Sequence, residues 1–307
     1  MENAQPSFVA RLPEWGLIHA SGTDAEAFLH GQLTNDLLAL PPDGAQWSAY
    51  CSAKGRMYAG FLVWRDGQDG FYLAVDRALV PALVKRLRMF VLRAKAVIED
   101  VSDAWAVYGL AAPDLAAACG TVAPGPFAVT RSQGLRIGMP AVNNLQRALA
   151  IEPAKAGPKF PLPEGTSSAW QSLMIHAGEV WITAATQEQF VPQMVNFDAI
   201  GGINFKKGCY PGQEVVARAH YRGAVKRRTY LAHVDANAKA GDALFASDLG
   251  GQKSGVVANA APVAGGGSDV LAVIQIQSHD KAEVRLGSPD GPLLAFADLP
   301  YPLPAAA

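Results

Sequence analysis

The last quarter of the chain is a succession of short β-type runs, and this pattern constrains the fold more than any other feature of the sequence. Beyond residue 226 the runs RRTYLAHV, ALFAS, KSGVVANAA, VLAVIQIQ and AEVRLG are separated by Gly, Asp and Pro. Short apolar runs punctuated by turn residues are typical of a small antiparallel barrel. We therefore predict a β-barrel domain over residues 226–307, preceded by a larger domain over residues 1–225.

The larger domain mixes strand and helix patterns. Apolar runs bounded by turn residues predict a three-stranded meander over residues 46–52, 56–65 and 71–76. Apolar side chains at helical spacing predict helices over residues 24–33 and 77–92. The first of these helices opens on Thr23 and Glu26, which have the spacing of a capping box.

Composition limits the class of protein. Of 307 residues 17% are charged and the formal net charge is -1, which is typical of a soluble globular protein whose contacts with polyanions are local. Cys51, Cys119 and Cys209 lie far apart and outside any metal-binding spacing, so we expect no disulfide framework, no metal site and a reducing cytoplasm. Because there is neither a basic start followed by an apolar run nor a run of about 18 apolar residues, we expect no signal peptide and no membrane span.

The segment KKGCYPGQEVVAR places Cys209 just before a predicted turn. Pro fixes φ near −65° and Gly tolerates positive φ, so residues 210–213 predict a β-turn, of type II, followed by a helix from about Gly212. Backbone N–H groups at the start of that helix, and the lysines before Cys209, would lower the thiol's pKa and favour the reactive thiolate. The alternative is that Cys209 is a small buried apolar residue.

Residues 206–228 form a basic segment. Seven cations stand there against one acid, Glu214, and the cations are Lys206, Lys207, Arg218, Arg222, Lys226, Arg227 and Arg228. Such a segment holds the carboxylates of a small anion, contacts RNA phosphates, or is solvated surface. Few aromatic residues are interleaved with the cations, which disfavours a dedicated nucleic-acid platform.

The string KGCYPGQEVVAR, followed by YRG and KRR, closely resembles the signature of the YgfZ family of folate-binding proteins. FLHGQLTNDL, YCSAKGRM and the AGEVWI…FVPQMVNFD approach to the signature occur in the family's order, so the resemblance covers most of the chain. This family is related to the glycine-cleavage T-protein, an aminomethyltransferase, and is implicated in assembly or maintenance of iron–sulfur enzymes.

The resemblance implies an α+β fold in which a cloverleaf of two interlocked α/β units and a β-barrel surround a central channel for tetrahydrofolate. A pterin edge needs hydrogen-bonding groups in an apolar slot, and the glutamate tail needs basic groups. The folate-binding candidates are Asn35, Asp36, Gln193, Asn196 and Glu214 on the pterin side, Lys207, Arg218 and Arg222 on the tail side, and Tyr210 and Gln213 in the signature. Each polar candidate has capping or turn stabilisation as its alternative role.

The sequence departs from the T-protein at two places. Where the methyltransferring relatives carry aspartate before an apolar strand, this chain has Ala59 and Gly60. Met174 and His176 stand where Arg and Glu are usual. Without that carboxylate the corresponding acid–base help is missing, so we do not expect glycine-cleavage activity.

The resemblance and these departures together predict a monomeric, tetrahydrofolate-binding accessory protein that serves iron–sulfur enzymes, including tRNA-modifying ones, with Cys209 as its functional thiol. Two alternatives remain. One is a true aminomethyltransferase that uses another acid, Asp36 or Glu214. The other is an adaptor whose basic segment docks on tRNA or on a partner protein.

Overall fold

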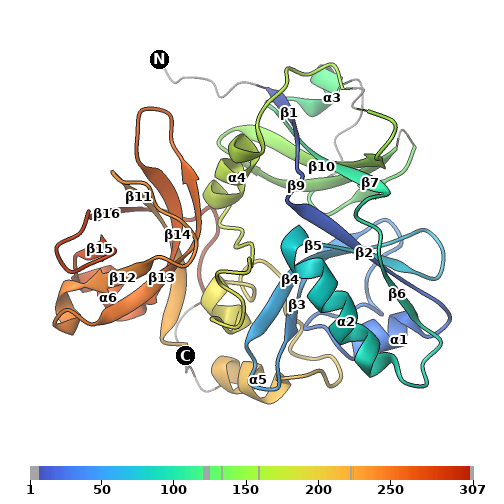
Figure 1. The fold of residues 1–307 in the computed structure, drawn as a ribbon, viewed down its shortest axis with the longest axis horizontal. Coiled ribbons are helices and arrows are strands. Elements are labelled where there is room, and N and C mark those ends of the chain that lie inside the picture. Colours follow the sequence, from blue (N-terminus) through green and yellow to red (C-terminus); the bar gives the residue numbers. More distant parts are fainter. Residues whose placement is uncertain are drawn as a thin grey trace. The chain divides into compact units, whose positions relative to one another are not determined.

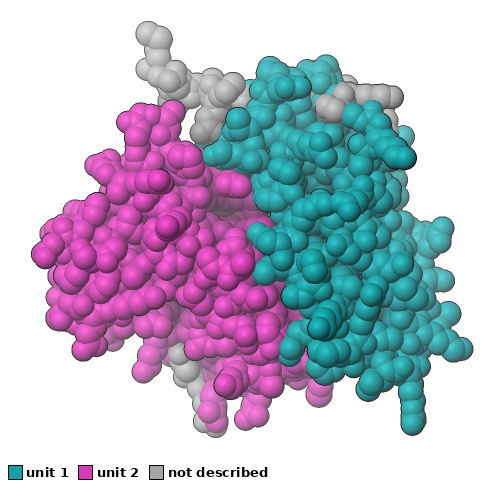
Figure 2. All heavy atoms as spheres, viewed as in Figure 1, with its two compact units in different colours: residues 1–31, 36–47, 61–170 teal, residues 32–35, 48–60, 171–307 magenta. Residues whose placement is uncertain are grey.

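The structure, a computed structural model, describes residues 7–119, 125–132, 134–157, 160–221, 223 and 225–304. The chain divides into two compact units (Figure 2). Unit 1 comprises residues 1–31, 36–47 and 61–170, and unit 2 comprises residues 32–35, 48–60 and 171–307. The predicted domain boundary at 225 falls inside unit 2 and stays a prediction.

Unit 1 contains an antiparallel sheet with the strand order β1-β7-β10-β9-β8. Its strands are β1 (Phe8–Arg11), β7 (Trp105–Ala112), β8 (Val129–Thr130), β9 (Leu135–Val142) and β10 (Leu145–Pro153). A short helix, α3 (Leu115–Cys119), follows β7. One face of this sheet packs a core of small and aliphatic side chains that includes Val9, Leu110 and Leu115.

A second sheet has the order β3-β4-β5-β2-β6. Its strands are β2 (Trp15–Ser21), β3 (Ala45–Cys51), β4 (Met57–Arg65), β5 (Phe71–Asp76) and β6 (Val97–Asp100). The predicted meander is thereby confirmed. The tip of the β3–β4 hairpin, residues 48–60, is assigned to unit 2.

The predicted helices flank this second sheet (Figure 1). They are α1 (Ala25–His30), and α2 (Val80–Val91) preceded by the 3-10 turn η1 (Arg77–Leu79). Helix α2 buries Val80, Leu83, Val84 and Leu87, a helical spacing that gives it one apolar face.

The predicted capping box of α1 is wrong. The helix begins at Ala25, so Asp24 and not Thr23 is the residue that precedes it, and the side chain of Asp24 does not cap it. Its carboxylate instead accepts the backbone N–H of Lys95 at 2.7 Å, and Glu26 pairs with Arg65. Distant partners therefore outcompete the local cap.

Unit 2 combines short helical segments with a six-stranded antiparallel sheet. The helical segments are α4 (Ser167–His176, which begins in unit 1), η2 (Pro192–Val195), α5 (Gln213–Tyr221), η3 (Ser247–Leu249) and α6 (Ile276–Lys281). The strands are β11 (Arg227–Val234), β12 (Ala243–Ala246), β13 (Lys253–Pro262), β14 (Ser268–Gln275), β15 (Val284–Leu286) and β16 (Leu294–Ala297).

The sheet of unit 2 has the order β15-β12-β13-β14-β11-β16 and appears in orange and red in Figure 1. Strands β11 to β15 follow the five predicted β-type runs, whereas β16 was not predicted. Alternate side chains such as Ala232, Val270 and Ile274 fill the core of the sheet. Among the described residues, a single bridge, Arg285 to Leu293, joins the region of β15 to that of β16. The sheet is thus a half-barrel, and the closed barrel, the cloverleaf and the channel remain predictions.

Candidate functional site

The segment around Cys209 contains the predicted turn. The N–H of Gln213 donates to the carbonyl of Tyr210 at 3.2 Å, and Gly212 has φ +79°. With Pro211 at the second position these features define a type II turn. Helix α5 starts at Gln213, as the sequence predicts.

Unit 2 holds this turn against the tip of the β3–β4 hairpin. A Cβ on Gly212 would overlap the Ser52 carbonyl oxygen and lie 2.7 Å from the Cα of Gly55. Gly55, at φ +68°, closes the hairpin tip by donating its N–H to Ser52 at 2.8 Å. Two glycines therefore allow two backbone turns to touch, which fixes the signature segment on a β-hairpin.

Cys209 is an exposed free thiol at the edge of this contact. The alternative of a small buried residue is therefore wrong for Cys209. Cys51 does fit that description, because it is buried and its burial raises the pKa of its thiol. The two thiols thus differ in access to solvent, and only Cys209 of this pair is placed for surface chemistry.

Lys207 lies inside unit 2. Its side chain is buried, and its Nζ donates to the carbonyl of Leu33 at 2.7 Å and lies 4.9 Å from the ring centroid of Tyr210. Tyr210 is also buried, and burial raises the pKa of its phenol. Lys207 therefore tethers the signature to the chain near Leu33. Its contact with a folate tail stays a prediction.

Asn35 and Asp36 have different surroundings. Asn35 is buried in unit 2, and its Nδ2 donates to the carbonyl of Gly201 at 2.7 Å. Asp36 is half-buried in unit 1, where its Oδ1 accepts the N–H groups of Leu38 and Ala39 at 3.0 and 3.2 Å. Asp36 thus holds local backbone, the alternative role stated for it above, whereas Asn35 binds the backbone of a residue 166 positions away in the sequence.

Gln193 and Asn196 are completely buried in and just after η2. Their amide nitrogens donate to the carbonyls of Val216 and Thr229, at 2.6 and 2.9 Å. Within the described residues, neither Oε1 of Gln193 nor Oδ1 of Asn196 has a hydrogen-bond partner. A buried amide oxygen without a hydrogen-bond partner is energetically costly, which makes these two acceptors unusual in the interior of unit 2.

The remaining candidates lie on or near α5. Gln213 is half-buried, whereas Glu214 and Arg218 are exposed. Arg222 lies outside the described residues. The tertiary structure therefore leaves Arg218 as the described tail-side candidate at the surface.

Fewer cations of the basic segment lie at the surface than its sequence suggests. Lys206, Arg218 and Lys226 are exposed and Arg227 is half-buried, but Lys207 and Arg228 are buried. Arg228 donates through Nη1 and Nη2 to the two carboxylate oxygens of Asp198, at 2.6 and 2.8 Å, and also to the carbonyl of Gln193. These two cations stabilise the interior of unit 2 and do not add to its surface charge.

A cluster that sequence reasoning missed joins α4 to the sheet of unit 2. The carboxylate of Asp269 contacts Nε2 of His176 at 2.6 Å and Nδ1 of His233 at 2.8 Å. Hydrogen bonds from His176 and then His233 lower the pKa of Asp269, and the bond to Asp269 raises the pKa of His233. The three residues are too far apart in sequence to give a local signal.

Ala59 and Gly60, the positions at which the resemblance to the T-protein predicts an aspartate, leave no room for a larger side chain. Ala59 is fully buried, and a Cβ on Gly60 would lie 2.8 Å from Cζ of Phe197. An aspartate at either position would therefore displace the core of unit 2.

The two α/β sheets and the half-barrel sheet together define a mixed α/β protein with a fold similar to that of an aminomethyltransferase. A solved structure of the glycine cleavage system aminomethyltransferase T from Bartonella henselae superposes with a TM-score of 0.68, covering 96% of this chain and 86% of that one at 16% identity. At that identity the likeness concerns the fold alone.

Curated relatives specify the family. The tRNA-modifying protein YgfZ of Escherichia fergusonii is 34% identical over 244 residues, and that of Escherichia coli O157:H7 is 34% identical over 247; each match covers 74% of this chain and 74% of the relative. No family model matches the chain. The chain belongs to the YgfZ family, as its signature indicates. No helix in the described part of the chain combines the length and apolarity that a membrane span requires.

Proposed function

We propose that this protein is a tetrahydrofolate-binding accessory factor for iron–sulfur enzymes of tRNA modification, with Cys209 as its reactive group. The observation that carries the proposal is the exposed thiol on a rigid support. Cys209 directly precedes a turn that two glycines lock onto a β-hairpin. A surface thiol needs no such framework unless its position matters.

Three described residues support the folate half of the proposal. Gln193 and Asn196 offer two buried amide oxygens that have no partner among the described residues, and the pterin ring carries N–H donors. Arg218 is an exposed cation for the carboxylates of the glutamate tail. When bound, tetrahydrofolate supplies a carrier of one-carbon units; the protein's part is to bind and orient it.

Calorimetric titration of the purified protein with tetrahydrofolate under anaerobic conditions tests the ligand. We expect saturable binding, weakened about tenfold in Asn196→Leu, which removes one of the two acceptors. Glu214→Gln is the control variant. Glu214 is a pterin-side candidate that is exposed on α5, so we expect this substitution to leave the affinity for tetrahydrofolate unchanged. Absence of binding at about 1 mM ligand would end the folate half of the proposal.

Complementation tests the thiol. In a strain that lacks the native gene, Cys209→Ser is expected to leave the iron–sulfur enzymes of tRNA modification impaired while still binding tetrahydrofolate. Cys51→Ala removes the buried thiol and is expected to complement. Full activity with Cys209→Ser would show that the exposed sulfur has no role.

The alternative of a true aminomethyltransferase needs an acid in place of the closed Ala59 and Gly60 positions. Of the two candidates, Asp36 binds local backbone and Glu214 is exposed. Methylene transfer from an aminomethylated carrier protein to tetrahydrofolate would establish that activity, and our proposal predicts none.

The adaptor alternative depends on the basic segment, in which the structure buries two of the cations. Such an adaptor would bind tRNA with an affinity that falls steeply with salt and is indifferent to folate.

A further inference from the structure

Unit 2 contains a small pocket in which three cationic side chains meet. Its volume is about 290 Å³, close to the lower limit of small-molecule sites, which is about 300 Å³. Strands β11, β13 and β14 of the half-barrel sheet line part of it, and residues 188–190 with Met194 line another part. None of the folate-binding candidates lines it, and its charged residues are Arg56, Glu188, Arg227 and Lys253.

The strand register brings two of these cations to one end of the sheet. Arg227 is the first residue of β11 and Lys253 is the first residue of β13, and both strands run antiparallel to β14, which lies between them. Arg227 pairs with Gln275, the last residue of β14, and Val256 pairs with Val273 close to that end. Neighbouring strands are about 4.8 Å apart, so the two cations start roughly 10 Å apart, a gap that their long side chains can span.

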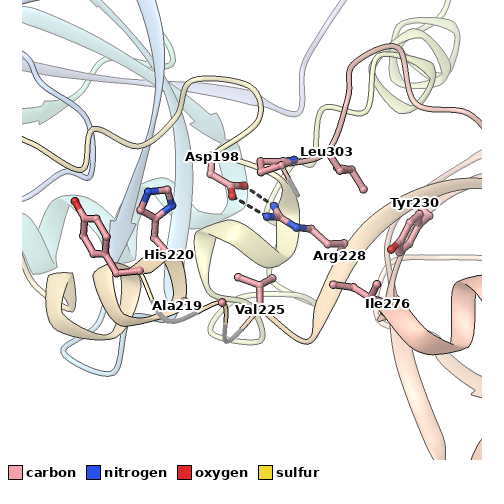
Figure 3. A pocket seen from close by; sticks show the side chains of 11 residues that line it. Asp198, Ala219, His220, Val225, Arg228, Tyr230, Ile276 and Leu303 are labelled. Atoms are coloured by element: carbon pink, nitrogen blue, oxygen red, sulfur yellow. Dashed lines mark hydrogen bonds and ion pairs between the residues drawn. The ribbon is translucent and has the colours of Figure 1, made fainter. Parts of the chain in front are cut away.

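Arg227 and Arg228 are neighbours in β11 with different surroundings. Figure 3 shows that Arg228 points at Asp198, and its guanidinium donates to both oxygens of that carboxylate. Successive side chains of a strand point to opposite faces, so Arg227 faces away from this pair. Among the described residues, the side chains of Arg227 and Lys253 have no ion pair and no hydrogen bond. Their charges are therefore available to a ligand.

Arg56 comes from the β3–β4 hairpin and is held in place. Its Nη1 donates to the carbonyl of Gln189, which uses one of the five N–H groups of the guanidinium. Arg56 is half-buried and makes no ion pair among the described residues. Glu188 is the acid of the pocket, and it too has no ion pair in the described part of the chain. Three cations against one acid leave an excess of two positive charges around the pocket.

This arrangement favours a tetrahedral dianion. A phosphate monoester has close to two negative charges at neutral pH and three terminal oxygens that accept hydrogen bonds. Its charge matches the excess around the pocket, and each terminal oxygen can accept from a different cation. A carboxylate has one charge and two oxygens in a plane, so it leaves one cation unmatched. Arginine, which supplies two of the three cations, also has the geometry that matches phosphate oxygens.

We propose that this pocket binds a phosphate monoester group, which Arg56, Arg227 and Lys253 contact. Two sources carry such a group, a small phosphorylated metabolite and the 5′ end of an RNA chain. The inference goes beyond the proposed function, and it depends neither on folate binding nor on Cys209. It predicts that binding responds to each charge that lines the pocket, with opposite signs for the cations and for Glu188.

Isothermal titration calorimetry at low salt and about pH 8 tests the ligand class. Ribose 5-phosphate is the small phosphate monoester, and acetate is the carboxylate control. We expect ribose 5-phosphate to bind saturably and at least about tenfold more tightly than acetate. A uridine oligomer with a 5′ phosphate distinguishes the sources: tighter binding than ribose 5-phosphate assigns the pocket to RNA ends, and equal or weaker binding assigns it to small molecules. In the first case, the same oligomer with a 5′ hydroxyl should bind at least about tenfold more weakly.

Substitutions of the lining residues test the site. Arg227→Gln and Lys253→Gln should each weaken the binding of ribose 5-phosphate about tenfold, because each removes one charge-assisted contact. Glu188→Gln should strengthen it about threefold, because it removes a negative charge beside the ligand. Lys281→Gln is the matched control for Lys253→Gln: Lys281 is an exposed lysine of α6 that does not line the pocket, so we expect no change. Thermal unfolding checks that each variant is folded.

Three results would overturn the inference: no saturable binding of ribose 5-phosphate up to about 20 mM, equal losses in Lys253→Gln and Lys281→Gln, or an affinity unchanged by Arg227→Gln or by Glu188→Gln. Tetrahydrofolate provides a further arm, because its glutamate tail is also anionic. Displacement of ribose 5-phosphate by tetrahydrofolate, with both weakened by Arg227→Gln, would assign the pocket to that tail and also overturn the inference. Failure of tetrahydrofolate to bind anywhere would contradict the proposed function and leave this inference standing.

Discussion

Gly212 touches the carbonyl of Ser52 so closely that no other residue fits at that position without moving one of the two turns. The contact joins the signature segment to a hairpin some 160 residues earlier in the chain. It explains why the signature needs glycine at position 212, both for the positive φ of the turn and for the close contact with the hairpin.

Gly212→Ala should therefore lower the free energy of unfolding by about 2–4 kcal/mol, because strain at positive φ adds to the overlap with Ser52. Urea denaturation measures the loss. Gly201→Ala is the matched control: Gly201 also has positive φ, +76°, but nothing lies within 4 Å of its Cβ position, so we expect about 1 kcal/mol. Equal losses in the two variants would show that the contact with Ser52 contributes nothing.

Arg228→Leu should destabilise the protein by about 3–5 kcal/mol, because it leaves the buried carboxylate of Asp198 without its partner. The variant Arg228→Met with Asp198→Leu should recover most of this loss. Arg285→Leu breaks the more exposed pair with Glu283 and should cost less than about 1 kcal/mol. Similar losses from Arg228→Leu and Arg285→Leu would contradict the assignment of the first pair to the interior.

The His176–Asp269–His233 cluster should make stability depend on pH. The raised pKa of His233 contributes stability that is complete below its unfolded value of about 6.5 and is lost as pH rises through the folded value. The lowered pKa of Asp269 contributes stability that is complete above about 3.9 and is lost as pH falls through the folded value. The contribution of His233 and Asp269 to the free energy of unfolding is therefore greatest between about pH 4 and 6.5.

Asp269→Asn tests this dependence. The loss of unfolding free energy should be about 1–2 kcal/mol at pH 5.5 and smaller at pH 8.5, since His233 is 37% exposed and solvent screens its charge. Urea titrations at both pH values measure it. Asp235→Asn, whose side chain is 96% exposed, should change little at either pH. A loss independent of pH would contradict the pKa shifts of His233 and Asp269.

Cys209 and Cys51 should differ in their reaction with iodoacetamide. Cys209 is exposed, whereas Cys51 is buried and its thiol pKa is raised, so in native protein Cys209 should react at least about 100-fold faster. Mass mapping of the labelled peptides distinguishes the two sites. In urea the difference should disappear, and a native Cys51 that reacts as fast as Cys209 would contradict the structure.

The sequence by itself determined the local features. Pro211 and Gly212 specify their turn through their own backbone preferences, so the turn and the start of α5 follow from a few adjacent residues. The β-type runs after residue 226 likewise specify strands, and the length and content of the signature indicate the family. The capping box failed because the partner that Asp24 binds, Lys95, is 71 residues away.

Tertiary structure decided which polar groups are available. Lys207 and Arg228 look like surface cations in the sequence, but one binds the carbonyl of Leu33, 174 residues away, and the other binds Asp198 in the interior. The unpartnered oxygens of Gln193 and Asn196, and the exposure of Cys209, likewise depend on packing between distant segments. Backbone preference acts between neighbours in the chain, whereas burial and charge pairing depend on which distant residues the fold brings together.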